Sequence, residues 1–327
     1  STLLEQASPE NPVERPMERI TTLQPVDLNG AIDASLDLSG AVVVGNYLIL
    51  GADEGHRLQL LRSAKEGGRW RLKKQLPLAK QDQETDIEAI TYGDGHLYVI
   101  GSHSWRRKRL KPELSVAKNR ERLQQVDQQE SRSRLYRVAF DPSTGKLGGN
   151  QRIDLSKRLR KDPLLGLFWG IPGKENGIDI EGIAFRDGLL YLGFRGPVLR
   201  DNLVPVMLLN FNQPKRYQLR FVCLDGQGIR DMVALDQGFL ILSAPVNDAT
   251  GPFCLWWWDG NDQIPGKDRA ASATQLLGAV STPGGAKAEG LALLQQDQMQ
   301  AMILVIYETE TAAQAVSMRV DLAALGV

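Results

Sequence analysis

One strand–turn–strand phrase recurs along the chain, and this recurrence constrains the fold more than any other feature. It reads DIEAITYGDGHLYVIG at residues 86–101 and DIEGIAFRDGLLYLGF at residues 179–194. Each copy has acids before a short apolar run, then a turn with Gly, then a second apolar run. Asp-Gly turns between such runs predict tight β-hairpins, because Gly accepts the positive φ that these turns need.

Five segments fit this pattern, and each hairpin is followed by further strand-like runs. Their leading residues are Ser39, Glu88, Glu181, Asp231 and Glu289. Units of four strands that repeat about every 40–50 residues are typical of propeller blades. The sequence therefore predicts an all-β fold, a five-bladed β-propeller that occupies residues 1–327 as a single domain.

Two parts of the chain fall outside the regular repeat. The run at residues 18–28 has no partner of its own, so we expect it to supply the strand missing from the last repeat, close the ring and cover an open sheet edge. Residues 104–133 lengthen the second repeat and are densely charged, which predicts a helical insertion in the second blade. A sixth blade is the alternative, because residues 156–177 are long enough to hide irregular strands.

Composition narrows the class of protein. Lys+Arg and Asp+Glu number 39 each, so the formal net charge is zero and no basic surplus indicates nucleic acid or a membrane surface as partner. No apolar run has the length of a membrane span. The N-terminus lacks a basic end followed by an apolar run, so we expect a cytoplasmic protein. The alternative is a periplasmic or secreted protein whose signal peptide has been removed.

The first strand of each propeller blade lines the central channel, so the five leading residues should meet on the axis. Four carboxylates there would repel one another unless a cation neutralised them. Oxygen ligands of this kind suit Ca²⁺. We therefore expect calcium to be held by Ser39, Glu88, Glu181, Asp231 and Glu289. The alternative is that the acids only accept backbone N–H bonds, or pair with Arg230 or Lys287 from neighbouring blades.

The loops between second and third strands should ring the channel mouth and carry the chemistry. Arginines beside a divalent cation suit a phosphate or carboxylate substrate, and a nearby carboxylate can act as general base. The predicted catalytic residues are Glu88, Glu181, Arg195 and His103. The predicted substrate-binding residues are Asp53, His56, Arg106 and Arg200.

The sequence resembles two known groups of propellers. DLSGAVVVGNYLILGADEGHRLQLL at residues 37–61, the two DIE phrases and KAEGLALL at residues 287–294 are similar to a bacterial family known only as domain of unknown function 3616. This resemblance spans nearly the whole chain and implies a propeller without an established activity. The order of the five leading residues is also similar to that of the calcium-activated nucleotidases, or apyrases. The fourth position differs, because Asp231 stands where the blade of those enzymes bears a Ser. That second resemblance implies metal binding more than nucleotide hydrolysis.

These observations predict a calcium-binding propeller. Metal-dependent hydrolysis of a phosphoester or another anionic small molecule is the function that the predicted site suits best, but the sequence leaves open whether the protein is an enzyme. One alternative is a non-catalytic propeller that binds a ligand or a protein on the same face. Another is a scaffold with a structural metal, in which residues 104–133 recruit a protein partner. We expect no nucleic-acid partner and no membrane partner.

Overall fold

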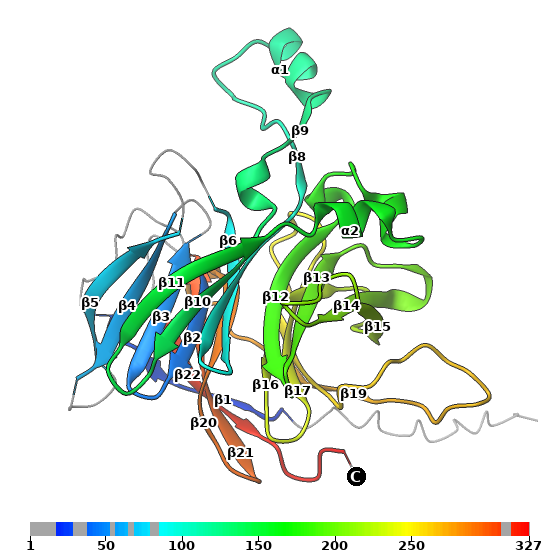
Figure 1. Ribbon diagram of the computed structural model, residues 1–327. Helices are drawn as coiled ribbons and strands as arrows, with labels where there is room; N and C mark the ends of the chain where they lie inside the picture. Colours follow the sequence, from blue (N-terminus) through cyan, green and yellow to red (C-terminus); the bar gives the residue numbers. More distant parts are fainter. Residues whose placement is uncertain are drawn as a thin grey trace, which may run out of the picture.

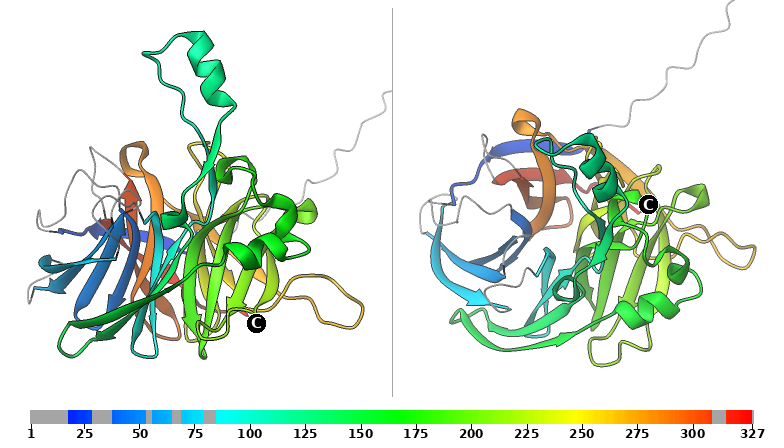
Figure 2. Two further views of the ribbon diagram at one scale, coloured as in Figure 1. Left: turned by 45° about the horizontal axis from the view of Figure 1, so that its top comes forward. Right: turned by 90° about the horizontal axis from the view of Figure 1, so that it is seen from above.

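Five four-stranded antiparallel sheets surround a central axis in the computed structural model (Figures 1 and 2). The structure describes residues 18–28, 38–52, 56–64, 69–78, 85–308 and 315–326. The first blade contains β2 (Leu38–Val44), β3 (Tyr47–Ala52), β4 (Arg57–Ser63) and β5 (Trp70–Pro77). The second contains β6 (Ile87–Gly93), β7 (His96–Gly101), β10 (Leu135–Asp141) and β11 (Lys146–Ile153).

The remaining three blades follow in chain order. The third contains β12 (Asp179–Arg186), β13 (Leu189–Gly196), β14 (Leu203–Leu209) and β15 (Gln218–Cys223). The fourth contains β16 (Gly228–Ala234), β17 (Phe239–Ala244), β18 (Cys254–Trp258) and β19 (Thr274–Ala279). The fifth contains β20 (Lys287–Gln296), β21 (Gln300–Glu308), β22 (Ala315–Asp321) and, as its outer strand, β1 (Ile20–Pro25).

The inner strands contact one another in the cyclic order β2, β6, β12, β16, β20 and back to β2. The predicted five-bladed arrangement is therefore confirmed. The alternative of a sixth blade is wrong, because residues 156–177 form the helix α2 (Ser156–Lys161) and the 3₁₀ turns Leu165–Phe168 and Gly173–Glu175. Further 3₁₀ turns lie at Glu130–Arg132, Arg200–Asn202 and Pro283–Gly285.

Hairpin turns behave as the sequence predicts. Asp94 and Gly95 have φ values of 49° and 78°, and Asp187 and Gly188 have 51° and 79°. Positive φ at both central residues is the signature of the tight type I′ turn, whose twist matches that of the flanking strands. These turns fix which residues of each inner strand face the channel.

The core lies between facing blades. The second strands, such as YLILGA in β3 and FLILSA in β17, are buried along their whole length because each has a blade on both sides. Ile229 packs with residues of β12 to β14 in one cluster, and Leu240 packs with residues of β20 to β22 in another. Outer strands such as β5 and β11 are mostly exposed.

Residues 104–133 lie between β7 and β10, and their middle part, which carries α1, stands away from the blades (Figures 1 and 2). They contain the short paired strands β8 (Trp105–Arg107) and β9 (Val126–Gln128), with the helix α1 (Val116–Leu123) between them. Among the described residues, no helix is long and apolar enough to cross a membrane.

Loss of β1 should destabilise the fold, because β1 supplies the outer ladder on β22 and Arg19 donates a 2.6 Å hydrogen bond to the Ala323 carbonyl. A chain that begins at residue 26 should unfold with a free energy lower by on the order of 3 kcal/mol than one that begins at residue 18, since several ladder hydrogen bonds are lost. Urea titration of both chains measures this difference. Equal stability of the two chains would contradict the prediction.

Candidate functional site

The inner strand of every blade carries a β-bulge at the same place. In each inner hairpin the pairing register shifts across one residue, and these residues are Ser39, Glu88, Glu181, Arg230 and Glu289. A bulged residue is left out of the ladder, and the strand bends there. The five bulges therefore bring one unpaired residue from each blade to the axis.

The fourth blade presents Arg230 at this position, so the prediction that Asp231 occupies it is wrong. The prediction counted back seven residues from Gly238, as in the second and third blades. However, Ala234 pairs with Phe239 across a four-residue loop, whereas Gly93 pairs with His96 across two residues. The loop is two residues longer, and the strand between the bulge and the loop is one residue shorter, so the count is displaced by one residue. Alignment on the apolar residue before each bulge would have found Arg230, because Ile229 corresponds to Ile87 and Ile180.

The buried guanidinium of Arg230 contacts all five inner strands. Its Nε donates to Glu289 Oε2 at 2.8 Å, and its Nη2 donates to the same oxygen. Its Nη1 donates to the Glu88 and Glu181 carbonyls at 3.3 and 3.2 Å, and its Nη2 donates to the Ser39 carbonyl at 3.3 Å. A guanidinium has five N–H donors, and all five are used here.

Carboxylates complete the neutralisation of this charge. Glu88 Oε2 lies 3.5 Å from Nη2 of Arg230, and Glu181 Oε2 lies 3.5 Å from Nε. Burial alone would lower the pKa of Arg230, but Glu289, Glu181 and Glu88 raise it well above its ordinary value. Arg230 is therefore a permanent internal cation on the axis.

The five residues expected to hold calcium do not fit a calcium site in this arrangement. Three of the expected carboxylates surround a guanidinium that already supplies the positive charge. Ser39 donates its hydroxyl to the Ile87 carbonyl, and Asp231 accepts from the Met232 and Leu291 amides at 2.7 and 2.9 Å. Within the described residues, no group of three or more His, Cys, Asp or Glu is arranged to hold a metal. The alternative of pairing with Arg230 describes the geometry better.

A second layer of buried charge lies two residues before two of the bulges. Asp86 lies 3.3 Å from Arg106 Nη2 and 3.5 Å from Arg132 Nη1, and it accepts a hydrogen bond from Ser102. Asp179 is also buried, and the positive charges of Lys174 and Arg195 lie near its carboxyl group. Asp86 and Asp179 both lie close enough to Glu88 to repel its charge.

The carboxyl groups of this cluster have opposite pKa shifts. Burial, together with the charges of Asp86 and Glu181, raises the pKa of Glu88 well above its ordinary value. Burial and Glu181 raise that of Asp179 in the same way. Burial alone would also raise the pKa of Glu181, but Arg195 and Arg230 lower it to about 2. Carboxyl groups whose pKa values are shifted in opposite directions thus share one buried site.

Asp231 lies away from this group, between the fourth and fifth blades. Burial raises its pKa to about 8, against the opposing effect of its backbone hydrogen bonds and of the nearby charge of Arg230. Its carboxyl group ties β16 to the backbone of β20, so its role is to join two inner strands.

Arg195 lies against Glu181, and most of its donors are engaged. Its Nη1 lies 3.3 and 3.2 Å from the two Glu181 oxygens. Its Nε and Nη2 donate to the Pro245 and Asn247 carbonyls at 2.8 and 3.2 Å. Arg195 therefore holds Glu181 ionised and fixes the loop after β17.

His103 does not fit the catalytic role predicted for it. Its side chain is fully buried, Nδ1 donates to the Gly101 carbonyl at 2.9 Å, and Nε2 accepts from the Leu155 amide at 3.3 Å. Burial also lowers its pKa, so the ring is neutral. Both ring nitrogens are occupied by backbone groups, which makes His103 a structural residue.

The remaining predicted substrate-binding residues are not gathered around the cluster. Arg106 reaches Asp86, and its side chain is 51% exposed at the channel mouth. His56 accepts a 3.1 Å hydrogen bond from Arg57, and Arg200 is exposed in a 3₁₀ turn before β14. Asp53 lies outside the described residues. The prediction missed Arg132, whose partner Asp86 was visible as the acid before Glu88.

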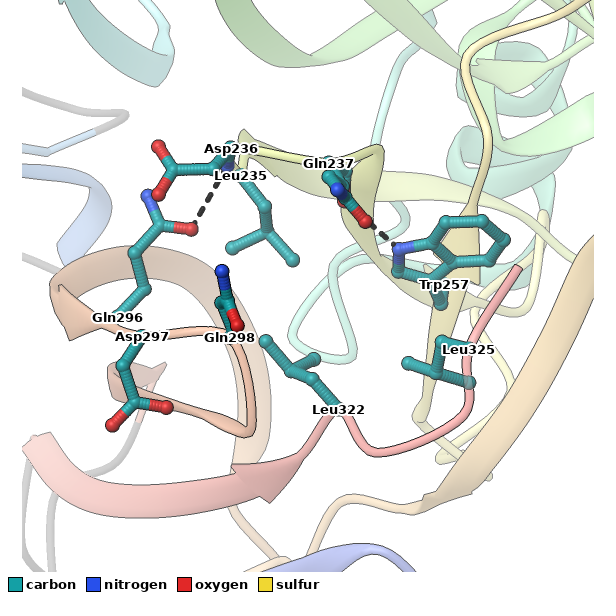
Figure 3. A pocket seen from close by; sticks show the side chains of 9 residues that line it. All are labelled: Leu235, Asp236, Gln237, Trp257, Gln296, Asp297, Gln298, Leu322 and Leu325. Atoms are coloured by element: carbon teal, nitrogen blue, oxygen red, sulfur yellow. Dashed lines mark hydrogen bonds between the residues drawn. The ribbon is translucent and has the colours of Figure 1, made fainter. Parts of the chain in front are cut away.

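A separate pocket lies at the other ends of the inner hairpins (Figure 3). It has a volume of about 380 Å³ and is lined by Leu235, Asp236, Gln237, Trp257, Gln296, Asp297, Gln298, Leu322 and Leu325. Two of its polar side chains form hydrogen bonds with nearby backbone. Trp257 Nε1 donates to the Gln237 carbonyl at 3.1 Å, and Asp297 Oδ1 accepts from the Met299 amide at 2.7 Å. None of the predicted site residues lines it.

Fold and site define a five-bladed β-propeller whose axis is closed by a buried arginine. The chain belongs to the family of proteins of unknown function DUF3616, whose family model matches residues 37–323. This membership confirms the first resemblance seen in the sequence. No curated protein matches the chain.

Solved structures of differently named proteins align with the chain at low sequence identity. Glutaminyl cyclase from Myxococcus xanthus aligns with a TM-score of 0.45 and 11% identity, over 92% of this chain and 96% of that one. The PQQ-bound aldose sugar dehydrogenase from Streptomyces coelicolor aligns with a TM-score of 0.44 and 10% identity, over 92% of this chain and 97% of that one. A hypothetical protein from Leishmania major aligns with a TM-score of 0.44 and 10% identity, over 92% of this chain and 90% of that one. Likenesses of this degree carry no information about activity.

Replacement of Arg230 should be among the most damaging changes to the fold. Arg230→Met should lower the free energy of unfolding by about 3–5 kcal/mol, because it leaves buried carboxylates without their partner. Arg230→Lys should recover little, since an ammonium has three donors in place of five. Urea unfolding measures both, with the exposed Arg200→Met as matched control, expected to change stability by less than about 0.5 kcal/mol. A loss no larger than that of the control would contradict this assignment.

Asp179 should make stability depend on pH. Its pKa is raised in the folded state, so above about pH 4 the unfolded chain ionises first and the folded state loses stability as the pH rises toward the folded pKa. Asp179→Asn removes this loss, so the variant should gain stability relative to wild type between pH 4 and pH 8. Urea titrations across this range test it, with the exposed turn variant Asp187→Asn as control. A constant difference between Asp179→Asn and wild type would contradict the prediction.

Proposed function

We propose that the channel mouth binds a small anionic molecule, and that the protonated carboxyl group of Asp179 or Glu88 donates a proton to it. The observation that carries the proposal is the opposite pKa shifts of neighbouring carboxyl groups. Glu181 is held ionised, with a pKa of about 2, while Glu88 and Asp179 are raised. Titratable groups whose environments separate their pKa values are typical of acid–base sites.

The charge balance favours an anion over a cation. Four arginines face five carboxyl groups here: Arg106, Arg132, Arg195 and Arg230 against Asp86, Glu88, Asp179, Glu181 and Glu289. Burial favours the uncharged forms of Glu88 and Asp179, which shifts this balance toward the positive groups. Arg106 makes one 3.3 Å contact with Asp86 and is half exposed, so it retains donors for a ligand. Guanidinium donors match phosphate and carboxylate oxygens.

Hydrolysis of a phosphoester or another ester is the reaction class that these groups suit. A carboxyl group protonated near neutral pH can protonate the oxygen of a leaving group. Glu181 is a weak base at its low pKa, so we assign it the positioning of Arg195 and Arg230 instead of proton abstraction. The proposed chemistry uses no calcium. Calcium binding stays a prediction from the sequence alone.

A second candidate is a propeller that binds a ligand or a protein without catalysis. It is favoured because all five donors of Arg230 bond to groups of the protein itself, as do Nε, Nη1 and Nη2 of Arg195. In this case the buried charges serve the fold alone, and the channel mouth acts only as a surface.

We also infer the finer organisation of the fold. The pairing of β1 with β22 supports closure of the ring by the N-terminal strand, and α1 supports a charged helical insertion at residues 104–133 within one domain. A cytoplasmic location stays a prediction.

The enzyme proposal is tested by measuring release of phosphate from nucleotides, sugar phosphates and inositol phosphates, and release of alcohol from carboxylic esters, each with EDTA present. We expect turnover of at least one substrate class, and a loss of about 10²-fold or more in Asp179→Asn or Glu88→Gln, as for removal of a general acid. Asp187→Asn is the matched control and should retain full activity. Turnover that is unchanged in both acid variants would overturn the assigned roles, and no turnover of any class would leave the second candidate.

A further inference from the structure

Residues 105–128, which we call the arm, project from the channel face of the propeller (Figures 1 and 2). A stalk formed by β8 and β9 carries the helix α1 at the tip. No residue of α1 is buried. The helix therefore gains nothing from packing against the propeller, although packing is the usual source of helix stability.

The tip is shaped by its own polar contacts. Ser115 Oγ caps α1 by accepting from the Lys118 amide at 3.2 Å. The side chain of Asn119 donates to the Lys111 carbonyl at 2.8 Å and accepts from its amide at 3.0 Å. Arg122 Nε donates to the Arg109 carbonyl at 2.6 Å. These bonds order a surface that the rest of the described chain does not cover.

That surface exposes apolar side chains. Leu110, Val116 and Leu123 are 52%, 71% and 48% exposed. Val116 and Leu123 are seven residues apart, which places them on the same side of the helix. Together these three are a large share of the exposed large hydrophobic residues in the described parts of the chain.

The arm is also strongly basic. Residues 105–128 contain eight Lys or Arg and three Asp or Glu, whereas the whole chain sums to zero. The arm thus carries a positive surplus beside exposed apolar groups, and the remainder of the chain carries the opposite surplus. A partner that matches this surface must be acidic and must offer apolar side chains.

We propose that the arm is a docking site for a protein segment that combines acidic residues with leucine-like side chains. The apolar side chains of the segment contact Val116 and Leu123, and its carboxylates pair with Lys118 and Arg120. A membrane surface fits less well, because α1 is short and the one aromatic residue of the arm, Trp105, packs edge-on against Trp169 at its foot. Nucleic acid fits less well, because phosphate contacts do not use exposed Leu and Val.

The foot of the arm places the docked segment beside the channel mouth. Arg106 of β8 contacts Asp86 at 3.3 Å, and Arg107 holds Glu175 through two hydrogen bonds of 2.8 Å. The docking proposal does not depend on the proposed hydrolysis, since no residue of the tip belongs to the carboxyl cluster.

Two labelled peptides test the proposal by fluorescence anisotropy. One is an acidic peptide with leucines at i, i+3 and i+7, and the other has the same charges with serines in place of the leucines. We expect the leucine peptide to bind wild type about tenfold tighter or more, because each apolar side chain that is buried contributes affinity. Val116→Asp should abolish this preference, and Arg120→Glu should weaken both peptides. Lys215→Glu, an exposed lysine in the loop after β14, is the matched control.

The competing occupants are measured with the same variants. Equal binding of the two peptides would overturn the proposal, because charge alone would then account for it. Tighter binding to phosphatidylserine vesicles or to duplex DNA, lost in Val116→Asp or Arg120→Glu, would overturn it in favour of those surfaces. Self-association in sedimentation that disappears in Val116→Asp would assign the arm to a second copy of the chain. Unchanged melting temperatures in the variants ensure that binding losses are not due to unfolding.

Discussion

One guanidinium joins all five blades, and the rest of the structure depends on it. Arg230 donates to Glu289 and to the carbonyls of Ser39, Glu88 and Glu181, so each neighbouring inner strand is tied to β16. A propeller buries polar backbone where its inner strands meet, and those groups need partners. A single planar cation with five donors satisfies them at once, a task that a metal ion would otherwise perform.

The bulges make this convergence geometrically accessible. A regular ladder would pair the leading residues within their own blade, whereas the bulge leaves them free to face the axis. Except for Asp231 in the fourth blade, the residue after each bulge is Gly or Ala, because neighbouring blades approach closely there. A side chain on Gly182 would lie 3.2 Å from the Cα of Asp231, and one on Gly290 would lie 3.3 Å from its carboxylate. The same crowding keeps water from the cluster, which explains why Glu88 and Asp179 favour their protonated forms.

The sequence predicts the architecture well because local turn and strand patterns determine each hairpin, and these patterns repeat along the chain. Asp94-Gly95 and Asp187-Gly188 determine their hairpins whatever lies around them, and the recurrence of the phrase gives the number of blades. The chemistry of the axis is less predictable because it depends on register. In the fourth blade a longer loop and a shorter inner strand together shift the count by one residue. That shift exchanged Arg230 for Asp231, and a built-in cation for an expected calcium. His103 was misjudged for a related reason: the Leu155 amide that occupies its Nε2 is distant in the sequence and becomes a neighbour only in the folded chain.

The claim that Arg230 takes the place of a metal is tested most directly by metal analysis together with thermal melting. The protein is purified without chelator, its calcium content is measured, and its melting temperature is compared in EDTA and after Ca²⁺ is returned. A site that binds only the folded state must raise its stability by mass action. The arginine-centred account predicts no stoichiometric calcium and the same melting temperature in both conditions. One calcium per chain, with a melting temperature that falls in EDTA and recovers with Ca²⁺, would contradict it.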